Sequence, residues 1–268
     1  VEVAARGMIE RAGRAEPPLP LARWRMRGQL AELRAPDLRF STQEVGALLA
    51  GAGMELPPAD VAALAERTEG WVGALALAIR SLRDGANPLG RLAAFAGSHR
   101  HLYDYLADEV LRRQPPAAQR FLLDTSILEH LSAELCDAVR GAEGAPDSHL
   151  LLDEVERAGL FLLPLDDERR WYRYHALFAE FLRERRRREG EGRAAGLHRR
   201  AAAWHEAHAM PGEAVSHYVA AGDPASAAAI VEREGRGLLL RSEAATVLAW
   251  VAALPAELAY WKQVVKDS

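Results

Sequence analysis

The stretch that decides the fold is LFLLPLDDERRWYRYHALF, residues 160–178. It begins with a short apolar run, passes through a charged segment at 166–170, and continues through residues rich in aromatic side chains. Short runs of this kind on either side of a polar turn are typical of β-strands joined in a hairpin. Apolar residues at helical spacing follow over 177–188, so the sequence predicts two short strands, a turn and a helix.

Helical patterns lie on both sides of this hairpin. Ser41 and Glu44 have the spacing of a capping box, which predicts a helix that begins there and ends at Gly51 and Gly53. The loosely alternating segment 29–40 is predicted to be extended. Before the hairpin, apolar spacing and turn residues predict further helices over 57–67, 71–83, 102–112, 117–123, 134–139 and 150–158.

Three helices, a two-stranded wing and a following helix indicate a winged-helix-like domain over 114–190, preceded by a helical domain over 41–113. After the winged helix, helices predicted at 197–209, 214–221, 225–234 and 243–254 are joined by short Gly/Pro turns. Such helix pairs resemble the start of a tetratricopeptide-like arm, which we place at 191–268. The predicted fold class is therefore mainly α, with one small β-hairpin.

Composition excludes several classes of function. The chain has 268 residues, a formal net charge of −4 and one cysteine, so we expect no global attraction to nucleic acid and no internal disulfide. No apolar run reaches the length of a membrane span, and a cytoplasmic location is expected. The only lysines are Lys262 and Lys266, and neither follows a glycine-rich turn at the start of a helix, so no Walker-type phosphate-binding loop is recognisable.

Several segments together resemble MalT-like, LuxR-type transcriptional activators, which belong to the signal-transduction ATPases with numerous domains. Residues 17–23 resemble the end of their nucleotide-binding domain, which makes 1–40 a remnant of that domain. Residues 68–72, Thr-Glu-Gly-Trp-Val, resemble a motif of their helical domain. Residues 121–126, Phe-Leu-Leu-Asp-Thr-Ser, and 165–178 resemble their winged-helix segment.

The resemblance implies a regulatory switch in which ADP holds a closed form, while ATP and an inducer permit oligomerisation and gene activation. A complete member has a phosphate-binding loop upstream and a helix-turn-helix domain at its far C-terminus, and both are expected to lie outside this chain. The isolated chain is therefore expected to be no enzyme and to hold no cofactor of its own. ATP or ADP is implied only through an upstream nucleotide-binding domain as partner, and an unknown inducer or partner protein is expected on the arm.

Four residues are carried over as candidate nucleotide-binding residues. His175 matches the histidine that faces the ADP phosphate in related switches, although the aspartate of that Met-His-Asp motif is absent here. Trp71 and Val72 match a Gly-x-Pro motif whose proline packs on adenine, with Val72 in place of the proline. Arg14 lies where a phosphate-sensing arginine follows a strand, but residues 8–13 do not look like that strand.

Two competing hypotheses remain open, a stand-alone helical interaction module and a winged-helix DNA binder. The second would use Arg183 and the arginines of 185–188, although cations at a helix end also complement the helix dipole, and no direct DNA contact is expected. His198, His205 and His208 can share one helix face, but their spacing favours a surface or inter-helix role over a metal site. Cys136 lies in an apolar stretch and is expected to be a buried core thiol.

Overall fold

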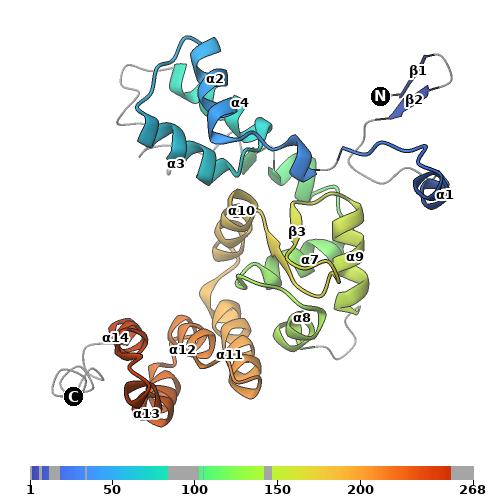
Figure 1. Cartoon of the computed structure of the whole chain (residues 1–268). Helices are drawn as coiled ribbons and strands as arrows, with labels where there is room; N and C mark the ends of the chain where they lie inside the picture. The colour runs from blue at the N-terminus through green and yellow to red at the C-terminus, as the bar shows by residue number, and fades with distance from the viewer. Residues whose placement is uncertain are drawn as a thin grey trace. The chain divides into compact units, whose positions relative to one another are not determined.

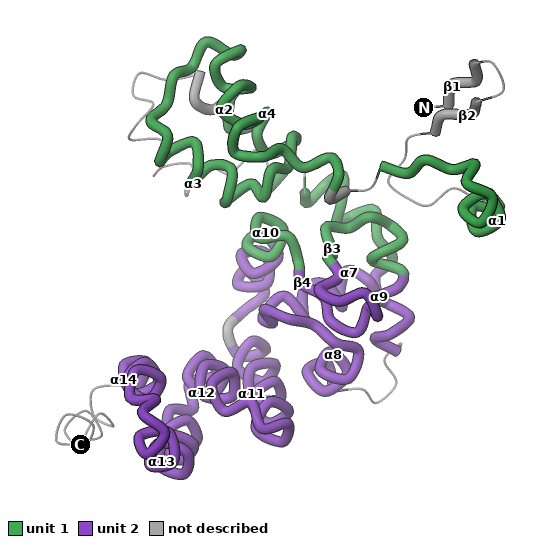
Figure 2. The backbone as a smooth tube through the Cα atoms, in the orientation of Figure 1, with its two compact units in different colours: residues 1–115, 154–163, 174–181 green, residues 116–153, 164–173, 182–268 purple. Residues whose placement is uncertain are grey.

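The structure is a computed structural model that describes residues 2–5, 8–11, 19–33, 35–83, 103–104, 106–141 and 147–254 (Figure 1). The chain divides into two compact units, coloured separately in Figure 2. Unit 1 comprises residues 1–115, 154–163 and 174–181, and unit 2 comprises 116–153, 164–173 and 182–268. The chain passes between the units several times, so α9, the hairpin and α10 each contribute residues to both.

Within its described residues, unit 1 begins with an antiparallel hairpin in which Glu2 pairs with Arg11 and Ala5 with Met8. The elements that belong wholly to unit 1 are β1 (Glu2–Ala5), β2 (Met8–Arg11), α1 (Leu21–Met26), the 3₁₀ helix η1 (Ala35–Leu38), α2 (Thr42–Gly51), α3 (Pro58–Thr68), α4 (Val72–Arg83) and the π-helix η2 (Leu106–Leu111).

The capping-box prediction for α2 is confirmed. The Ser41 hydroxyl accepts a hydrogen bond from the Glu44 N–H, and the Glu44 carboxylate accepts one from the Ser41 N–H at 2.8 Å. These bonds satisfy two backbone donors that a helix start leaves without partners. The helix then packs its apolar face against α3 and α4 in a core formed by Val45, Leu49, Leu64, Ala65, Leu75 and Ala78.

Two predictions for the first forty residues are wrong. Segment 29–40 contains no strand among its described residues, and it ends in η1. Pro36 has no backbone N–H and a fixed φ, so it favours a turn there over a strand. Conversely, residues 8–11 form a strand, because pairing with β1 satisfies backbone groups that a single short segment leaves unpaired.

The predicted winged helix is present, with three helices, a hairpin and a fourth helix in that order. Its elements are α7 (Pro116–Thr125), α8 (Ala133–Arg140), α9 (Ser148–Arg157), β3 (Leu162–Pro164), β4 (Tyr172–Tyr174) and α10 (Ala176–Arg187). Leu165 N donates to Trp171 O at 2.8 Å near the turn of the hairpin. Leu131 pairs with Tyr172 through reciprocal backbone bonds of 2.8 and 2.9 Å, so a short bridge extends the wing.

Four helices follow the winged helix and form the arm: α11 (Glu191–Ala207), α12 (Pro211–Ala220), α13 (Pro224–Leu240) and α14 (Ala244–Ala253). Proline at the first position of α12 and α13 supplies a preset φ at a place where no N–H is needed. The last three helices share a core whose members include Val215, Ile230, Val231, Val247 and Val251. The helical-arm part of the predicted fold class is therefore present.

Cys136 lies on α8 with no exposed surface, and burial raises the pKa of its thiol, so the prediction of a core cysteine is confirmed. In the part of the chain that the structure describes, no helix combines the length and apolar character needed to cross a bilayer. The predicted domain boundaries stay predictions.

Candidate functional site

His175 lies in unit 1 between β4 and the start of α10, and the residue is only 4% exposed. Nε2 is 3.0 Å from the carbonyl oxygen of Thr68, and Nδ1 is 3.3 Å from the N–H of Leu177. A carbonyl can only accept and a backbone N–H can only donate, so Nε2 carries the hydrogen and Nδ1 the lone pair. Both ring nitrogens are therefore used, and one of them fixes the ring to the C-terminal end of α3.

Glu69 makes a second connection beside the first. Its carboxylate accepts a hydrogen bond of 2.8 Å from the Ala176 N–H, one of the free donors at the start of α10. The same carboxylate lies 3.6 Å from Arg39. A negative charge at a helix N-terminus is favourable because the helix dipole is positive there. Glu69 and His175 thus connect the end of α3 to the start of α10 through two polar contacts.

Gly70 makes the tight turn after α3 possible. Its φ is +68°, in the left-handed region that favours glycine, and its carbonyl accepts a 2.9 Å hydrogen bond from the Phe40 N–H. A Cβ at this position would lie 2.3 Å from the carbonyl oxygen of Phe40. The backbone of Phe40 therefore occupies the space in which any other residue would place its side chain.

An aromatic cluster packs beside these polar contacts. The Trp71 ring meets the Phe161 ring edge to face at a centroid distance of 4.8 Å, and the His175 ring at 5.9 Å. Phe161 also contacts the Phe178 ring at 5.4 Å, and its carbonyl accepts a 2.8 Å bond from the His175 N–H. Because aromatic pairs of this geometry contribute beyond their buried area, the cluster stiffens the joint around His175.

The four predicted site residues have different outcomes. His175 and Trp71 lie together, as described above. Val72 follows Trp71 in sequence, but its side chain is 47% exposed at the start of α4. Arg14 lies outside the described residues. His175 is buried, and both of its ring nitrogens have protein partners. The four residues remain predictions as nucleotide ligands.

Three residues of this joint were missed as individual contributors: Thr68, Glu69 and Phe161. Thr68 and Glu69 were quoted only as part of the motif at 68–72. The carbonyl of Thr68 contacts His175, and the carboxylate of Glu69 caps α10, more than a hundred residues away. Such pairings are not visible in the local pattern. Phe161 gave no signal of its role. Its φ of +56° is uncommon for an aromatic residue, but a backbone angle cannot be read from the sequence.

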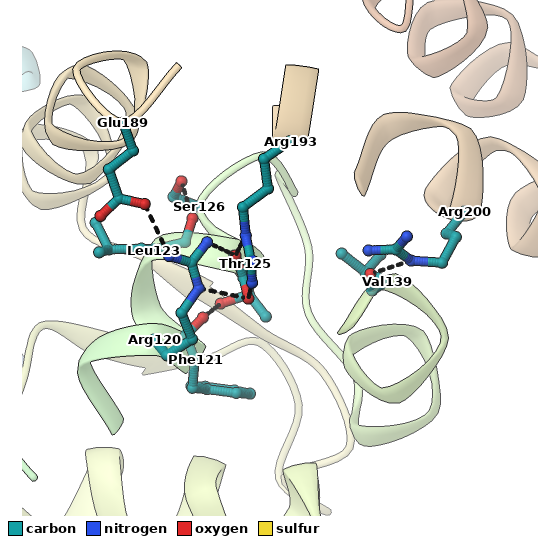
Figure 3. A network of polar contacts seen from close by, with 10 residues as sticks. Arg120, Phe121, Leu123, Thr125, Ser126, Val139, Glu189, Arg193 and Arg200 are labelled. Atoms are coloured by element: carbon teal, nitrogen blue, oxygen red, sulfur yellow. Dashed lines mark hydrogen bonds and ion pairs between the residues drawn. The ribbon is translucent and has the colours of Figure 1, made fainter. Parts of the chain in front are cut away.

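In unit 2, a buried carboxylate joins the winged helix to the arm (Figure 3). The side chain of Asp124, on α7, is 4% exposed and accepts hydrogen bonds from Arg120 of the same helix and Arg193 of α11. Burial acts to raise the pKa of Asp124, but the bonds from the two arginines outweigh it and lower the pKa. Arg120 also bonds Glu189 at 2.8 Å, which lies between α10 and α11.

Two further arginines use backbone carbonyls in the same unit. Arg183 of α10 donates to the carbonyl of Ser126 at 2.8 Å, and Arg200 of α11 donates to that of Val139 at 2.6 Å. Figure 3 shows the second contact, between Arg200 and Val139. Together these bonds hold α10 and α11 against α7 and α8. Arg183 of the arginine-rich segment is therefore engaged within the protein.

The three predicted histidines, two on α11 and His208 directly after it, separate into two roles. His198 and His205 face His217 of α12, with His198 Nδ1 2.9 Å from His217 Nδ1. His208 instead stacks on Trp204, at a centroid distance of 3.8 Å. Among the described residues, no group of three His, Cys, Asp or Glu side chains is arranged to hold a metal ion. The inter-helix role is confirmed for the first two.

Comparison with known proteins agrees with this architecture. Residues 107–194 match the family model described as the MalT winged helix domain. Over these residues the chain is similar to a MalT winged helix domain. The match is to a domain of transcriptional regulators and not to a catalytic domain, and it includes the Asp124 network, the hairpin and His175. The resemblance drawn from the motifs is confirmed, and the MalT winged helix domain overlaps the predicted range 114–190.

Relatives of this chain extend well beyond the MalT winged helix domain. The serine/threonine-protein kinase PknK of Mycobacterium tuberculosis (strain ATCC 25618 / H37Rv) is 40% identical over 241 residues, which is 90% of this chain and 21% of PknK. The HTH-type transcriptional regulator MalT of Cronobacter sakazakii is 35% identical over 246 residues, 90% of this chain and 27% of that protein. MalT of Klebsiella pneumoniae subsp. pneumoniae is 35% identical over 242 residues, 89% and 26% respectively. The chain thus spans between a fifth and about a quarter of the length of these relatives.

Proposed function

We propose that this chain is the regulatory middle region of an ATP-dependent, LuxR-family transcriptional activator in the cytoplasm. It would couple the nucleotide state of an upstream ATPase domain to the binding of an inducer or partner protein by the arm. The assignment to a regulatory region of a MalT-type activator rests on the match to a MalT winged helix domain. It also rests on MalT relatives that align with about nine-tenths of the chain. The nucleotide coupling and the sensing by the arm are the proposed part.

The observation that carries the coupling is the joint at His175. The imidazole bonds the last residue of α3, and Glu69 caps α10 from the next residue along. A change in the position of α3 would therefore act on the start of α10 through two polar contacts. Following the resemblance to MalT-like activators, we assign nucleotide binding to an upstream nucleotide-binding domain.

One observation favours a second candidate function, in which this region regulates a kinase domain and not a DNA-binding domain. The chain is more similar to PknK, at 40% identity, than to the MalT proteins, at 35%. The name of PknK describes a kinase and that of MalT a DNA-binding regulator, so the same region occurs in proteins with different outputs. The region would then be a regulatory module that serves either kind of effector domain.

The alternative of direct DNA binding has less support. Arg183 donates to a backbone carbonyl, and Arg187 and Arg188 pair with Glu184 on the same helix at 3.1 and 3.3 Å. These contacts reduce the charge that the helix offers to a phosphate backbone. We therefore expect only weak, salt-sensitive retention on DNA.

The test uses fluorescently labelled ADP and two proteins, this chain and the complete product of its gene. We expect saturable binding to the complete product and none to the chain. The variant His175→Gln, in the complete product, keeps an N–H donor but removes the rigid ring that holds the Nδ1 acceptor 3.3 Å from the N–H of Leu177. It should change the ratio of ADP to ATP affinity, while the exposed-site control His149→Gln should not.

Two results would contradict the proposal. Tight binding of labelled ADP by the chain alone would mean that it holds its own nucleotide site. An unchanged ADP to ATP ratio in His175→Gln, with normal folding by circular dichroism, would mean that the joint does not transmit the nucleotide state.

A further inference from the structure

Three histidines meet inside unit 2 where the first two helices of the arm pack together. His198 and His205 lie on α11 and His217 lies on α12. The His205 ring stacks on the His217 ring with a centroid distance of 5.2 Å and an interplanar angle of 19°. His205 is buried, and the other two are half-buried. We call these three residues the histidine cluster.

One contact in the histidine cluster depends directly on protonation. Nδ1 of His198 and Nδ1 of His217 are 2.9 Å apart, which is hydrogen-bond distance. One of these nitrogens must carry the hydrogen and the other the lone pair. If both rings are fully protonated, two N–H groups of like charge face each other and the bond is lost. The contact therefore requires at least one uncharged ring.

The charges around the cluster oppose a positive imidazole. Arg186 and Arg183 of α10 both act against protonation of His198, and Arg186 is itself buried, with Nε and Nη1 lacking a hydrogen-bond partner. His208 acts in the same way on His205, whereas the carboxylate of Glu213 favours its charged form.

The other described groups around this joint are either engaged in bonds of their own or apolar. Glu206 of α11 already accepts bonds from Arg233 of α13, at 2.9 Å, and from Tyr218 of α12, at 3.1 Å. On the side of α8, Arg200 donates to the Val139 carbonyl. The contribution of α14 to the core of the arm is apolar, through Val247 and Val251. A proton on the cluster would thus meet mostly positive or neutral surroundings.

We propose that the histidine cluster is an acid-sensitive lock that holds α12 against α11 only while its rings are uncharged. The position of the lock gives it a regulatory meaning, because α11 bonds the winged helix through Arg193 and Arg200 while α12 leads into the rest of the arm. Opening the lock would release the arm from a helix that stays fixed to α7 and α8. This inference goes beyond the proposed nucleotide coupling and does not depend on it.

The direction of the pH effect follows from the pKa shifts. Burial, followed by the nearby positive groups, lowers the pKa of His198 to about 4 and that of His217 to about 3, and burial also lowers the pKa of His205. In the released arm the pKa of each of these rings would return to its ordinary value near 6.5. A folded-state pKa below the unfolded one means that the lock is fully stable above pH 6.5 and weakens as the pH falls below it. At pH 5.5 the equilibrium shifts toward release about tenfold for each such histidine.

The experiment measures amide hydrogen exchange in the full chain at pH 7.5 and pH 5.5, corrected for the intrinsic effect of pH on exchange. We expect protection of α12 to fall about a hundredfold at pH 5.5, since His198 and His217 each contribute a factor of about ten. Protection of α7, in the winged helix, should change much less. The double variant His198→Gln and His217→Gln should lose most of this pH dependence, and His149→Gln, an exposed histidine of α9, should retain it.

Equal protection of α12 at both pH values in the wild-type chain would overturn the proposal, and so would a double variant with unchanged pH dependence. If the double variant does not fold, the ring protons of the wild-type chain decide the question by NMR. The rings of His198 and His217 should remain uncharged at pH 5.5 in the folded form. Titration of both rings near pH 6.5 without loss of the α11–α12 contacts would exclude a lock.

Discussion

Replacing Gly70 by alanine should weaken the joint around His175 at its tightest point. Gly70 has a φ of +68°, and an added Cβ would lie 2.3 Å from the carbonyl oxygen and 2.7 Å from the nitrogen of Phe40. Both atoms belong to the backbone, so the overlap cannot be relieved by rotating a side chain. The chain must move at Phe40, at Gly70, or at both.

The magnitude follows from what this movement breaks. The left-handed conformation alone costs an alanine about 1–2 kcal/mol. Separating the two segments also removes the hydrogen bond from Phe40 N to Gly70 O, worth about 1 kcal/mol. Phe40 packs against the core of α2, α3 and α4, and partial exposure of its ring costs about another 1 kcal/mol. We therefore expect Gly70→Ala to destabilise this region by about 3–4 kcal/mol.

Gly53→Ala is the matched control, because Gly53 has a similar φ of +76° but nothing within 4 Å of the added Cβ. It should cost only the conformational part, so the two variants should differ by about 2 kcal/mol, or roughly thirtyfold in the opening equilibrium. The assay is native-state hydrogen exchange of buried amides in α2, α3 and α4. Equal destabilisation by the two substitutions would refute the reasoning, since it would show that the approach of Phe40 is not a real constraint.

Two other predictions concern unit 2. Asp124→Asn should lower the free energy of unfolding, measured by urea titration, by about 2–3 kcal/mol, because it weakens the charge-assisted bonds from Arg120 and Arg193. The control Asp167→Asn, in the exposed turn, should have little effect in the same titration. Since the pKa of Asp124 is lowered in the folded state, its contribution should be fully present above pH 4 and decrease as the pH falls further. A wild-type advantage over Asp124→Asn that does not decrease below pH 4 would contradict this. Cys136 should react with N-ethylmaleimide only after unfolding, because the thiol is buried and its pKa is raised; rapid labelling of the native chain, measured by mass spectrometry, would show that α8 opens easily.

The helical part of the fold is predictable from sequence because its signals are local. The capping box at Ser41 and Glu44 and the prolines before α12 and α13 act within one turn of the helix they begin. The hairpin was visible for the same reason, since its two apolar strands flank a charged turn. The strand at 8–11 was not visible, because its stability comes from pairing with β1 and not from its own composition.

The site was only partly predictable because its contacts join distant segments. Resemblance to a family identified His175 and Trp71, together with Val72 and Arg14, as candidate residues. It did not identify the Thr68 carbonyl or the Glu69 carboxylate as their partners, since a backbone carbonyl carries no sequence signal. His217 was missed for a similar reason, because the face that α12 presents to α11 is set by the packing of the two helices.

The most direct test of the central claim is hydrogen exchange of the His175 joint in the complete gene product, with ADP or with a non-hydrolysable ATP analogue bound. The amides that report on the joint are those of Phe40, His175, Ala176 and Leu177, which donate to Gly70, Phe161, Glu69 and His175 respectively. We predict that their protection differs between the two nucleotide states, because the end of α3 and the start of α10 are fixed to each other there. Identical protection in both states, with nucleotide binding verified for each, would contradict the claim that this joint transmits the nucleotide state.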